Sequence, residues 1–87
     1  MAYQVSILPA ALRQLAKFPK PVQKRIQEQI DTLADNPRPH GSKLLEGQQG
    51  FYRLRVGDYR VIYQIEAAQP TVLVVRIGHR REVYRRI

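Results

Sequence analysis

Apolar and polar residues alternate at the start of the chain, over residues 3–7, which predicts a strand with one buried face. Pro9 suits the first position of a helix, and apolar residues then recur at helical spacing as far as Ala16. Pro19 and Pro21 break this spacing. The chain is therefore expected to begin with a strand and a short helix.

A second helix is predicted to open at Pro21, because five apolar residues follow at the spacing of a single helix face. These residues are Val22, Ile26, Ile30, Leu33 and Ala34. Asn36-Pro37 ends this helix. Residues 37–50 are rich in Pro, Gly, Ser and Gln, so a loop is expected there. The short link between the two helices predicts a helical hairpin.

Three further strands are predicted in the second half of the chain. Residues 51–56 and 59–65 alternate between apolar and polar side chains, and residues 71–77 are nearly all apolar. Gly57-Asp58 between the first two is the signal of a two-residue hairpin turn, with Gly first as in type II′. Residues 80–87 are expected to form a short helical turn.

These elements predict an α+β fold in a single domain spanning residues 1–87. It consists of a small antiparallel β-sheet with an N-terminal helical hairpin packed on one face. The predicted order is strand, helix, helix and three strands, followed by the C-terminal helical turn.

The net charge of the chain gives the first indication of a function. The 87 residues carry 15 Lys and Arg against 7 Asp and Glu, a net charge of +8, and eleven of the basic residues are Arg. Arg is suited to planar, bidentate contact with phosphate and to stacking on bases. A polyanionic partner is therefore expected.

Several classes of protein are excluded by what the sequence lacks. It has no run of about 18 apolar residues for a membrane helix, and its N-terminus does not resemble a signal peptide. Without Cys it cannot form disulfides, a thiolate metal site or a cysteine nucleophile, and the isolated His40 and His79 do not make a zinc site. We expect a cytoplasmic protein with no metal, no cofactor and no membrane partner.

The Gly57-Asp58 turn predicts where the arginines point. A two-residue loop pairs Arg55 with Arg60, so alternation places Arg53, Arg55 and Arg60 on one face of the sheet with Ile62. The apolar side chains of the same hairpin lie on the other face, against the helices. They are Tyr52, Leu54, Val56, Tyr59, Val61 and Tyr63.

Two interpretations of this arginine face stay open. Like charges directly opposite each other destabilise a sheet, which favours a binding site for an anion such as phosphate. Alternatively, the face is solvated and neutralised by acids such as Glu46, Glu66 or Glu82. Arg76 either extends the arginine face or forms an ion pair with an acid.

The C-terminal segment brings further chemistry next to the sheet. Tyr84 suits proton transfer or stacking on a base, and equally an aromatic anchor that packs the segment on the sheet. A single His such as His79 is more often a capping or core-edge residue than a catalytic one.

Three segments of the chain carry a family resemblance. They are Lys43-Leu44-Leu45, residues 52–63 and residues 78–84. In this order and spacing the chain resembles the RelE/ParE superfamily of toxins from toxin–antitoxin pairs, over nearly its whole length and most closely the RelE branch.

The resemblance implies a metal-independent endoribonuclease that cuts mRNA in the ribosomal A site. The 2′-hydroxyl attacks the adjacent phosphorus and leaves a 2′,3′-cyclic phosphate. Arg60 and Arg80 would stabilise the charge that develops on the phosphate oxygens. Five further basic residues would bind RNA and its phosphates. These are Lys43, Arg53, Arg55, Arg76 and Arg81.

The resemblance leaves the general base open, because some relatives have Lys where this chain has Arg53 and Arg55, and Arg is a poor base. Glu46 and His79 are the candidates, and His79 is favoured for its intrinsic pKa. Tyr84 would stack on the base or assist proton transfer.

Two other functions remain as alternatives. The ParE branch shares the fold and inhibits DNA gyrase without cutting RNA, but it usually lacks the Arg and Tyr that this chain has at Arg80 and Tyr84. An inactive relative would serve only as partner and co-repressor. For each, the resemblance implies a cognate RelB-like antitoxin that contacts operator DNA, with the ribosome and mRNA as further partners of a RelE-like enzyme.

Overall fold

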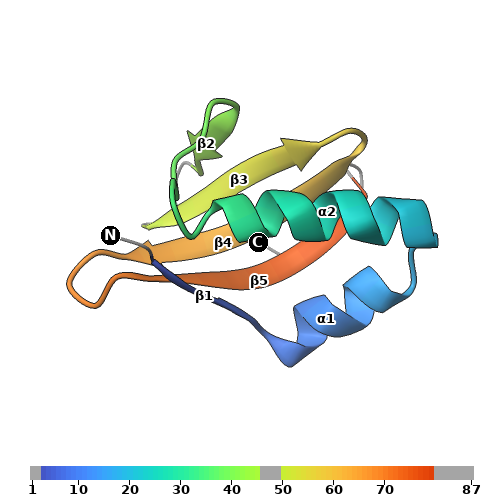
Figure 1. Cartoon of the computed structure of the whole chain (residues 1–87), viewed down its shortest axis with the longest axis horizontal. Coiled ribbons are helices and arrows are strands. Elements are labelled where there is room, and N and C mark those ends of the chain that lie inside the picture. Colours follow the sequence, from blue (N-terminus) through green and yellow to red (C-terminus); the bar gives the residue numbers. More distant parts are fainter. Residues whose placement is uncertain (1–2, 46–49, 80–87) are drawn as a thin grey trace.

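The computed structural model describes residues 3–45 and 50–79, which form an α+β fold, as predicted (Figure 1). Strand β1 is followed by two helices and four strands. Their bounds are β1 (Gln4–Ile7), α1 (Pro9–Ala16), α2 (Lys20–Thr32), β2 (Ser42–Leu44), β3 (Phe51–Val56), β4 (Tyr59–Glu66) and β5 (Thr71–His79). The predicted helical turn over residues 80–87 lies outside the described residues.

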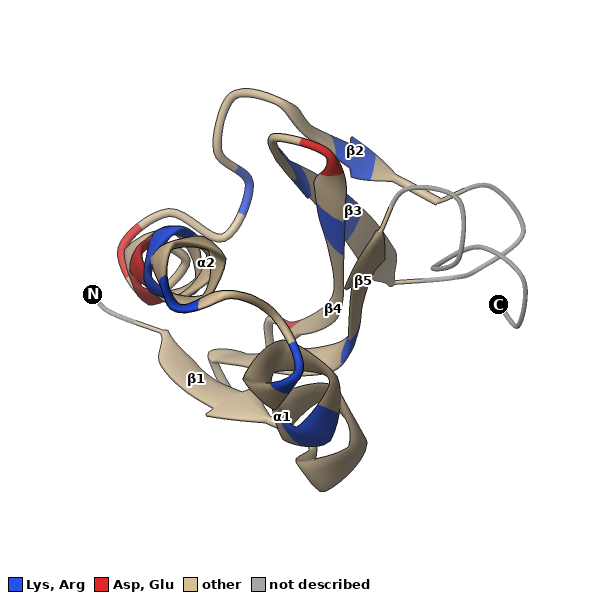
Figure 2. Ribbon diagram, turned by 90° about the vertical axis from the view of Figure 1, so that its right-hand side faces the viewer, with Lys and Arg blue, Asp and Glu red and all other residues tan. Residues whose placement is uncertain are grey.

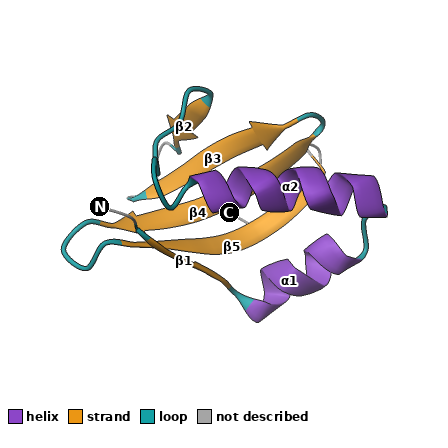
Figure 3. Cartoon of the chain, viewed as in Figure 1, coloured by secondary structure: helices purple, strands orange, loops and turns teal. Residues whose placement is uncertain are grey.

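Both helices lie on the same side of the sheet, as the helical hairpin predicted (Figure 3). α1 begins at Pro9, the predicted first position, and ends at Ala16, before the prolines predicted to break it. α2 begins at Lys20, one residue before the predicted start. Ile26, Ile30 and Leu33 of the predicted apolar stripe are completely buried. Each fully buried aliphatic side chain of this size stabilises a fold by about 1.5–3 kcal/mol. The stripe therefore fixes α2 on the sheet. Within the described residues, neither helix is long and apolar enough to cross a membrane.

The strands follow the order β1-β5-β4-β3-β2. β3, β4 and β5 pair antiparallel to one another, as predicted, and β2 pairs antiparallel to β3, but β1 lies parallel to β5 at the edge of the sheet. No tight turn joins these two strands, so nothing in the nearby sequence fixes their relative direction. The sheet is therefore mixed at this edge.

Strand β2 adds an element that the predicted order lacked, in a segment expected to be a loop. Its three residues pair with Leu54, Arg53 and Tyr52 of β3. A three-residue strand is too short to show a recognisable alternation in the sequence. It is defined instead by its pairing with β3. It is an edge strand that extends the sheet beyond β3.

The register of β3 and β4 is the predicted one. Val56 pairs with Tyr59 and Arg55 with Arg60 across the Gly57-Asp58 turn. Gly57 has a φ of +60°, whereas Asp58 does not have a positive φ. A positive φ at the first turn residue alone is the signature of the predicted type II′ turn.

Strand β5 contains one residue more than β4 at its centre. The register shifts between Ile62, which pairs with Arg76, and Tyr63, which pairs with Val74, so that Val75 is an inserted residue. Such a β-bulge reverses which face the following side chains occupy. β1 pairs with β5 only as far as Val74. Beyond it, the backbone N–H of Ile77 donates to Oε1 of Gln14 in α1, at 2.8 Å.

Candidate functional site

Cations of four strands share the side of the sheet that the helices do not cover, here called the open face. Residues directly opposite one another in an antiparallel sheet point to the same side. One row across the strands consists of Lys43, Arg53, Ile62 and Arg76, and the next of Arg55, Arg60 and Gly78. In Figure 2, Lys and Arg positions follow one another on β2 and β3. The register therefore brings five predicted site residues to one face.

Arg60 is the buried member of this group, with 7% of its surface exposed. Its Nη1 donates to the backbone oxygens of Gly57, at 3.1 Å, and Tyr59, at 3.0 Å. Its Nε is buried and has no hydrogen-bond partner among the described residues. Leaving a buried donor of a charged group unsatisfied is costly. The turn thus holds Arg60 in place, while its Nε stays an unsatisfied donor among the described residues.

The other cations differ in exposure. Arg55, directly opposite Arg60, is exposed, as is Lys43, whereas Arg53 and Arg76 are half-buried. The guanidinium of Arg offers planar donors that match phosphate, and the Lys side chain offers donors on a flexible stem. One buried arginine surrounded by accessible cations is an arrangement that can position a phosphate and bind the chain that carries it.

Of the acids expected to neutralise this face, Glu66 is the one that lies within the described residues. Glu66 is exposed at the far end of β4, and its Oε1 accepts a hydrogen bond of 3.1 Å from the backbone of Ala68 in the adjoining turn. Glu46 and Glu82 lie outside the described residues. Both interpretations of the arginine face therefore stay open.

The bulge at Val75 determines where the side chains at the end of β5 go. Strict alternation from Val72 and Val74, which are buried in the core, would place His79 on the open face. With one inserted residue, Arg76 and Gly78 pair with Ile62 and Arg60 instead. Arg76 thereby joins the open face.

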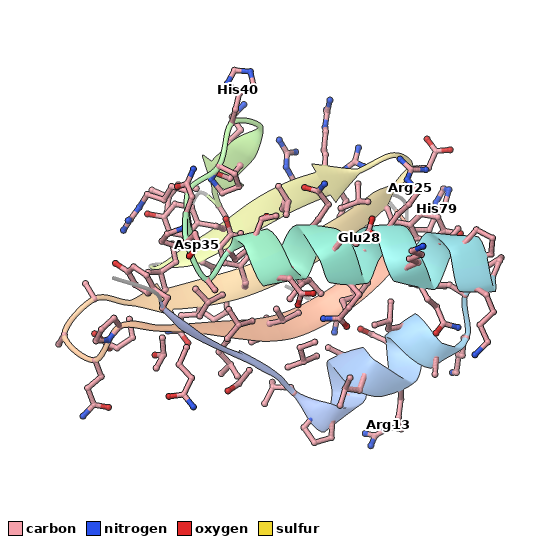
Figure 4. The ribbon with its side chains drawn as sticks, viewed as in Figure 1. Arg13, Arg25, Glu28, Asp35, His40 and His79 are labelled. Atoms are coloured by element: carbon pink, nitrogen blue, oxygen red, sulfur yellow. The ribbon has the colours of Figure 1, made fainter. Side chains whose placement is uncertain are left out.

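His79 lies on the helix side of the sheet, opposite to Arg60. It pairs with Tyr59, and the two rings meet edge to face with centroids 5.9 Å apart. The Tyr59 ring in turn lies 4.7 Å from that of Phe18. Figure 4 labels His79 beside the N-terminal half of α2, close to the label of Arg25. The described structure thus does not bring this predicted base to the arginine face.

Four predicted site residues lie outside the described residues: Glu46, Arg80, Arg81 and Tyr84. Within the described residues, no group of three His, Cys, Asp or Glu side chains that could hold a metal ion occurs. The roles of Glu46 as base, of Arg80 and Arg81 as phosphate ligands and of Tyr84 as stacking group stay predictions.

One cluster that supports the site was not found from the sequence. Arg38 donates from Nε to the hydroxyl of Tyr52, at 3.1 Å, with its guanidinium carbon 5.3 Å from the ring centre. Tyr52 stacks on Tyr63 at 5.8 Å, and the Tyr63 hydroxyl donates to the Pro37 carbonyl at 2.7 Å. This cluster ties the segment before β2 to β3 and β4. It therefore helps to position Lys43.

Hydrogen bonding and burial act on the ionisation of this cluster. The hydrogen bond to Tyr52 raises the pKa of Arg38, and burial raises the pKa of the Tyr63 hydroxyl. Both groups therefore keep their protons throughout the neutral range. Only the tyrosines carried a sequence signal, through the alternation that placed them against the helices.

Comparison with known proteins agrees with this fold. A model of the ParE toxin family of type II toxin–antitoxin systems (parDE) matches residues 5–84. The chain belongs to the RelE/ParE toxin superfamily. It is a RelE-like toxin of a toxin–antitoxin system, as the three sequence segments predicted.

Relatives of this toxin match it over nearly their whole length. Toxin RelG of Mycobacterium tuberculosis is 32% identical over 87 residues, 99% of this chain and 100% of RelG. The mRNA interferase toxin RelE of Escherichia coli K12 is 30% identical over 97% of this chain and 92% of its own. In the crystal structure of the archaeal RelE–RelB complex from Pyrococcus horikoshii, the matched chain is 31% identical with a TM-score of 0.83, covering 95% of this chain and 100% of that one. The α+β fold is thus shared with a RelE toxin.

Proposed function

We propose that this toxin is an endoribonuclease that cuts mRNA in the A site of the ribosome and so inhibits translation. The single observation that carries the proposal is Arg60, a buried guanidinium with an unused Nε donor at the centre of the cationic open face. A relative of similar length is named an mRNA interferase toxin, which agrees with this reaction.

The proposed reaction is an in-line displacement at phosphorus. The 2′-oxygen forms a bond to the adjacent phosphorus, the bond from phosphorus to the 5′-oxygen breaks, and a 2′,3′-cyclic phosphate remains. Negative charge grows on the non-bridging oxygens, where a fixed guanidinium stabilises the transition state. Arg60 supplies one such group, and Arg80 is proposed as the second. Lys43, Arg53, Arg55, Arg76 and Arg81 are proposed to hold the RNA.

Two proton transfers complete the reaction, since a base takes the 2′-hydroxyl proton and an acid protonates the leaving 5′-oxygen. His79 and Glu46 are the predicted bases. The ring of His79 contacts Tyr59 on the helix side, so Glu46 is the base to test first. Tyr84 is proposed to stack on the base or to assist proton transfer.

The open face is also the surface that a partner must cover to silence the toxin. The matched Pyrococcus structure is a complex of RelE with RelB. We infer that an acidic, RelB-like antitoxin binds this toxin and covers or displaces its active site. Contact with operator DNA is expected only through that complex.

Primer extension on mRNA in programmed ribosomes tests the proposal. Wild-type protein should cut within the A-site codon, and Arg60→Ala should lower the cleavage rate by about 10²-fold or more, as expected for loss of one preorganised charge-stabilising donor. Arg13→Ala is the matched control, because Arg13 is an exposed arginine of α1 (Figure 4). Uncut mRNA with the wild type would reject the nuclease.

A second candidate function is inhibition of DNA gyrase, which is favoured by the ParE description of the matching family model. A supercoiling assay tests it. Loss of supercoiling with intact mRNA would establish the ParE-like function. A protein that is inactive in both assays but binds its antitoxin would be an inactive relative that serves as co-repressor.

A further inference from the structure

A cleft of about 280 Å³ lies between α2 and the turn that joins β3 and β4. Its lining comes from both elements: Arg25, Glu28 and Gln29 of α2, and Arg55, Val56 and Gly57 of the hairpin. Figure 4 labels Arg25 and Glu28 on the side of α2 that faces this turn. Val56 is the one apolar residue among those that line it.

The cleft exists because β2 is short. β2 pairs with β3 only from Tyr52 to Leu54, so the edge of β3 from Arg55 onward has no strand beside it in the described part of the chain. On the other wall, Arg25, Glu28 and Gln29 have the i, i+3 and i+4 spacing that places side chains on the same face of a helix. The strand edge and this helix face form the two walls.

Arg25 is held against the turn. A side-chain carbon at Gly57 would lie 3.4 Å from Nη2 and 3.6 Å from Nη1 of Arg25, so the guanidinium lies over the bare glycine. No carboxylate pairs with Arg25 or Arg55 anywhere in residues 3–45 and 50–79. Two like charges therefore border the cleft, and Glu28 is the one acid among the residues that line it.

The cleft is continuous with the open face through Arg55. This residue lines the cleft and is also directly opposite Arg60 across β3 and β4. A polyanion that places one phosphate at Arg60 must pass Arg55 when it continues over the hairpin turn. Arg25 is the other cation that lines the cleft.

We propose that Arg25 and Arg55 form a second phosphate site, which binds the RNA backbone next to the phosphate at Arg60. This inference rests on the proposed function, because it takes RNA as the ligand of the open face. Glu28 and Gln29 add acceptors beside the two cations, and the 2′-hydroxyl gives RNA a donor for such acceptors. An acidic protein segment would need apolar contacts, but the exposed leucines Leu8, Leu12 and Leu44 do not line the cleft.

Substitution of neighbouring cations on α2 tests this site. Arg25→Gln removes a cleft cation, and Lys24→Gln removes the adjacent exposed charge outside the cleft. The probe is a fluorescein-labelled single-stranded RNA hexamer, followed by anisotropy over a range of salt concentrations and checked for integrity on a gel. Arg25→Gln should weaken binding about five- to tenfold and reduce the slope of log K against log salt by about 0.7, the value for one lost phosphate contact. Lys24→Gln should change the affinity less than about twofold.

Three outcomes overturn the proposal. Equal losses in both variants would show that only total charge matters, and an unchanged Arg25→Gln would show that the cleft is not used. If binding of an oligoglutamate peptide depends on Arg25 and binding of RNA does not, the cleft is assigned to an acidic protein.

Cleavage on ribosomes keeps this inference separate from the proposed function. If the protein binds RNA through Arg25 but leaves mRNA intact on ribosomes, the phosphate site is supported and the nuclease function is rejected. If the protein cuts mRNA but Arg25→Gln binds the hexamer as well as the wild type does, the nuclease function is supported and the phosphate site is rejected.

Discussion

Arg55 of β3 and Arg60 of β4 lie directly opposite each other on the open face of the sheet. Side chains in this relationship have their Cβ atoms about 4.5–5.5 Å apart, and like charges there are destabilising. One of the pair, Arg60, is also buried, so water screens it poorly. The sheet therefore holds an electrostatic cost that a bound anion would relieve.

Removing the exposed member of the pair should stabilise the free protein. We expect Arg55→Gln to raise the free energy of unfolding by about 0.2–1 kcal/mol, because it removes the repulsion and leaves Arg60 hydrogen-bonded. Urea unfolding measures this. Arg13→Gln, a substitution on exposed α1 surface, should stay within about 0.5 kcal/mol of the wild type. A loss of stability in Arg55→Gln would contradict the repulsion.

Removing the buried member should abolish stabilisation by anions. Inorganic phosphate at about ten times its Kd should raise the Tm of the wild type by roughly 6–11 °C, as mass action predicts for a domain of this size. Arg60→Gln should lose most of this shift, because phosphate then lacks the positive charge of the Arg60 guanidinium. Arg13→Gln should keep it. An equal shift in Arg60→Gln would mean that phosphate binds elsewhere.

The hairpin of β3 and β4 could be predicted from the sequence because its register depends on local chemistry. A two-residue turn with Gly57 at positive φ permits only one pairing of the flanking residues, and alternation then assigns every side chain to a face. The helical hairpin was predictable for a similar reason, since prolines and one apolar stripe mark its limits.

The features that escaped prediction depend on contacts distant in sequence. β2 is defined by its pairing with β3, and the direction of β1 by its place beside β5. The bulge at Val75 has no signal of its own, yet it moves Arg76 to the open face and His79 to the helix side. The composition of the candidate site thus depends on one inserted residue.

The hydrogen bond from Ile77 to Gln14 should help to maintain that inserted register. Gln14→Leu leaves the Ile77 N–H without its acceptor at the place where β1 no longer pairs with β5, at an expected cost of about 1–3 kcal/mol. Amide hydrogen exchange should show faster exchange at Ile77. Gln14→Glu, which keeps an oxygen acceptor, should retain most of the protection. Unchanged exchange in Gln14→Leu would show that the strand does not need this contact.

The hydroxyl of Tyr63 should stabilise the fold through its hydrogen bond to Pro37. Its hydroxyl donates to the Pro37 carbonyl, and Tyr63→Phe should lower the free energy of unfolding by about 0.5–1.5 kcal/mol at neutral pH. Tyr59→Phe is the control, because it removes a hydroxyl from the same face of the sheet without breaking the contact to Pro37. Urea unfolding at neutral pH compares the two variants. Equal effects would mean that the contact to Pro37 contributes nothing specific.

The pH dependence follows from the raised pKa of Tyr63. Burial holds this pKa above the unfolded value of 10.0, so the folded state binds the proton more tightly than the unfolded state does. The resulting stability is fully present below the unfolded pKa and is lost as the pH rises through the folded one. Between about pH 8 and pH 11, the wild type should therefore lose more stability than Tyr63→Phe. Parallel pH profiles for the two proteins would rule out Tyr63 as the source.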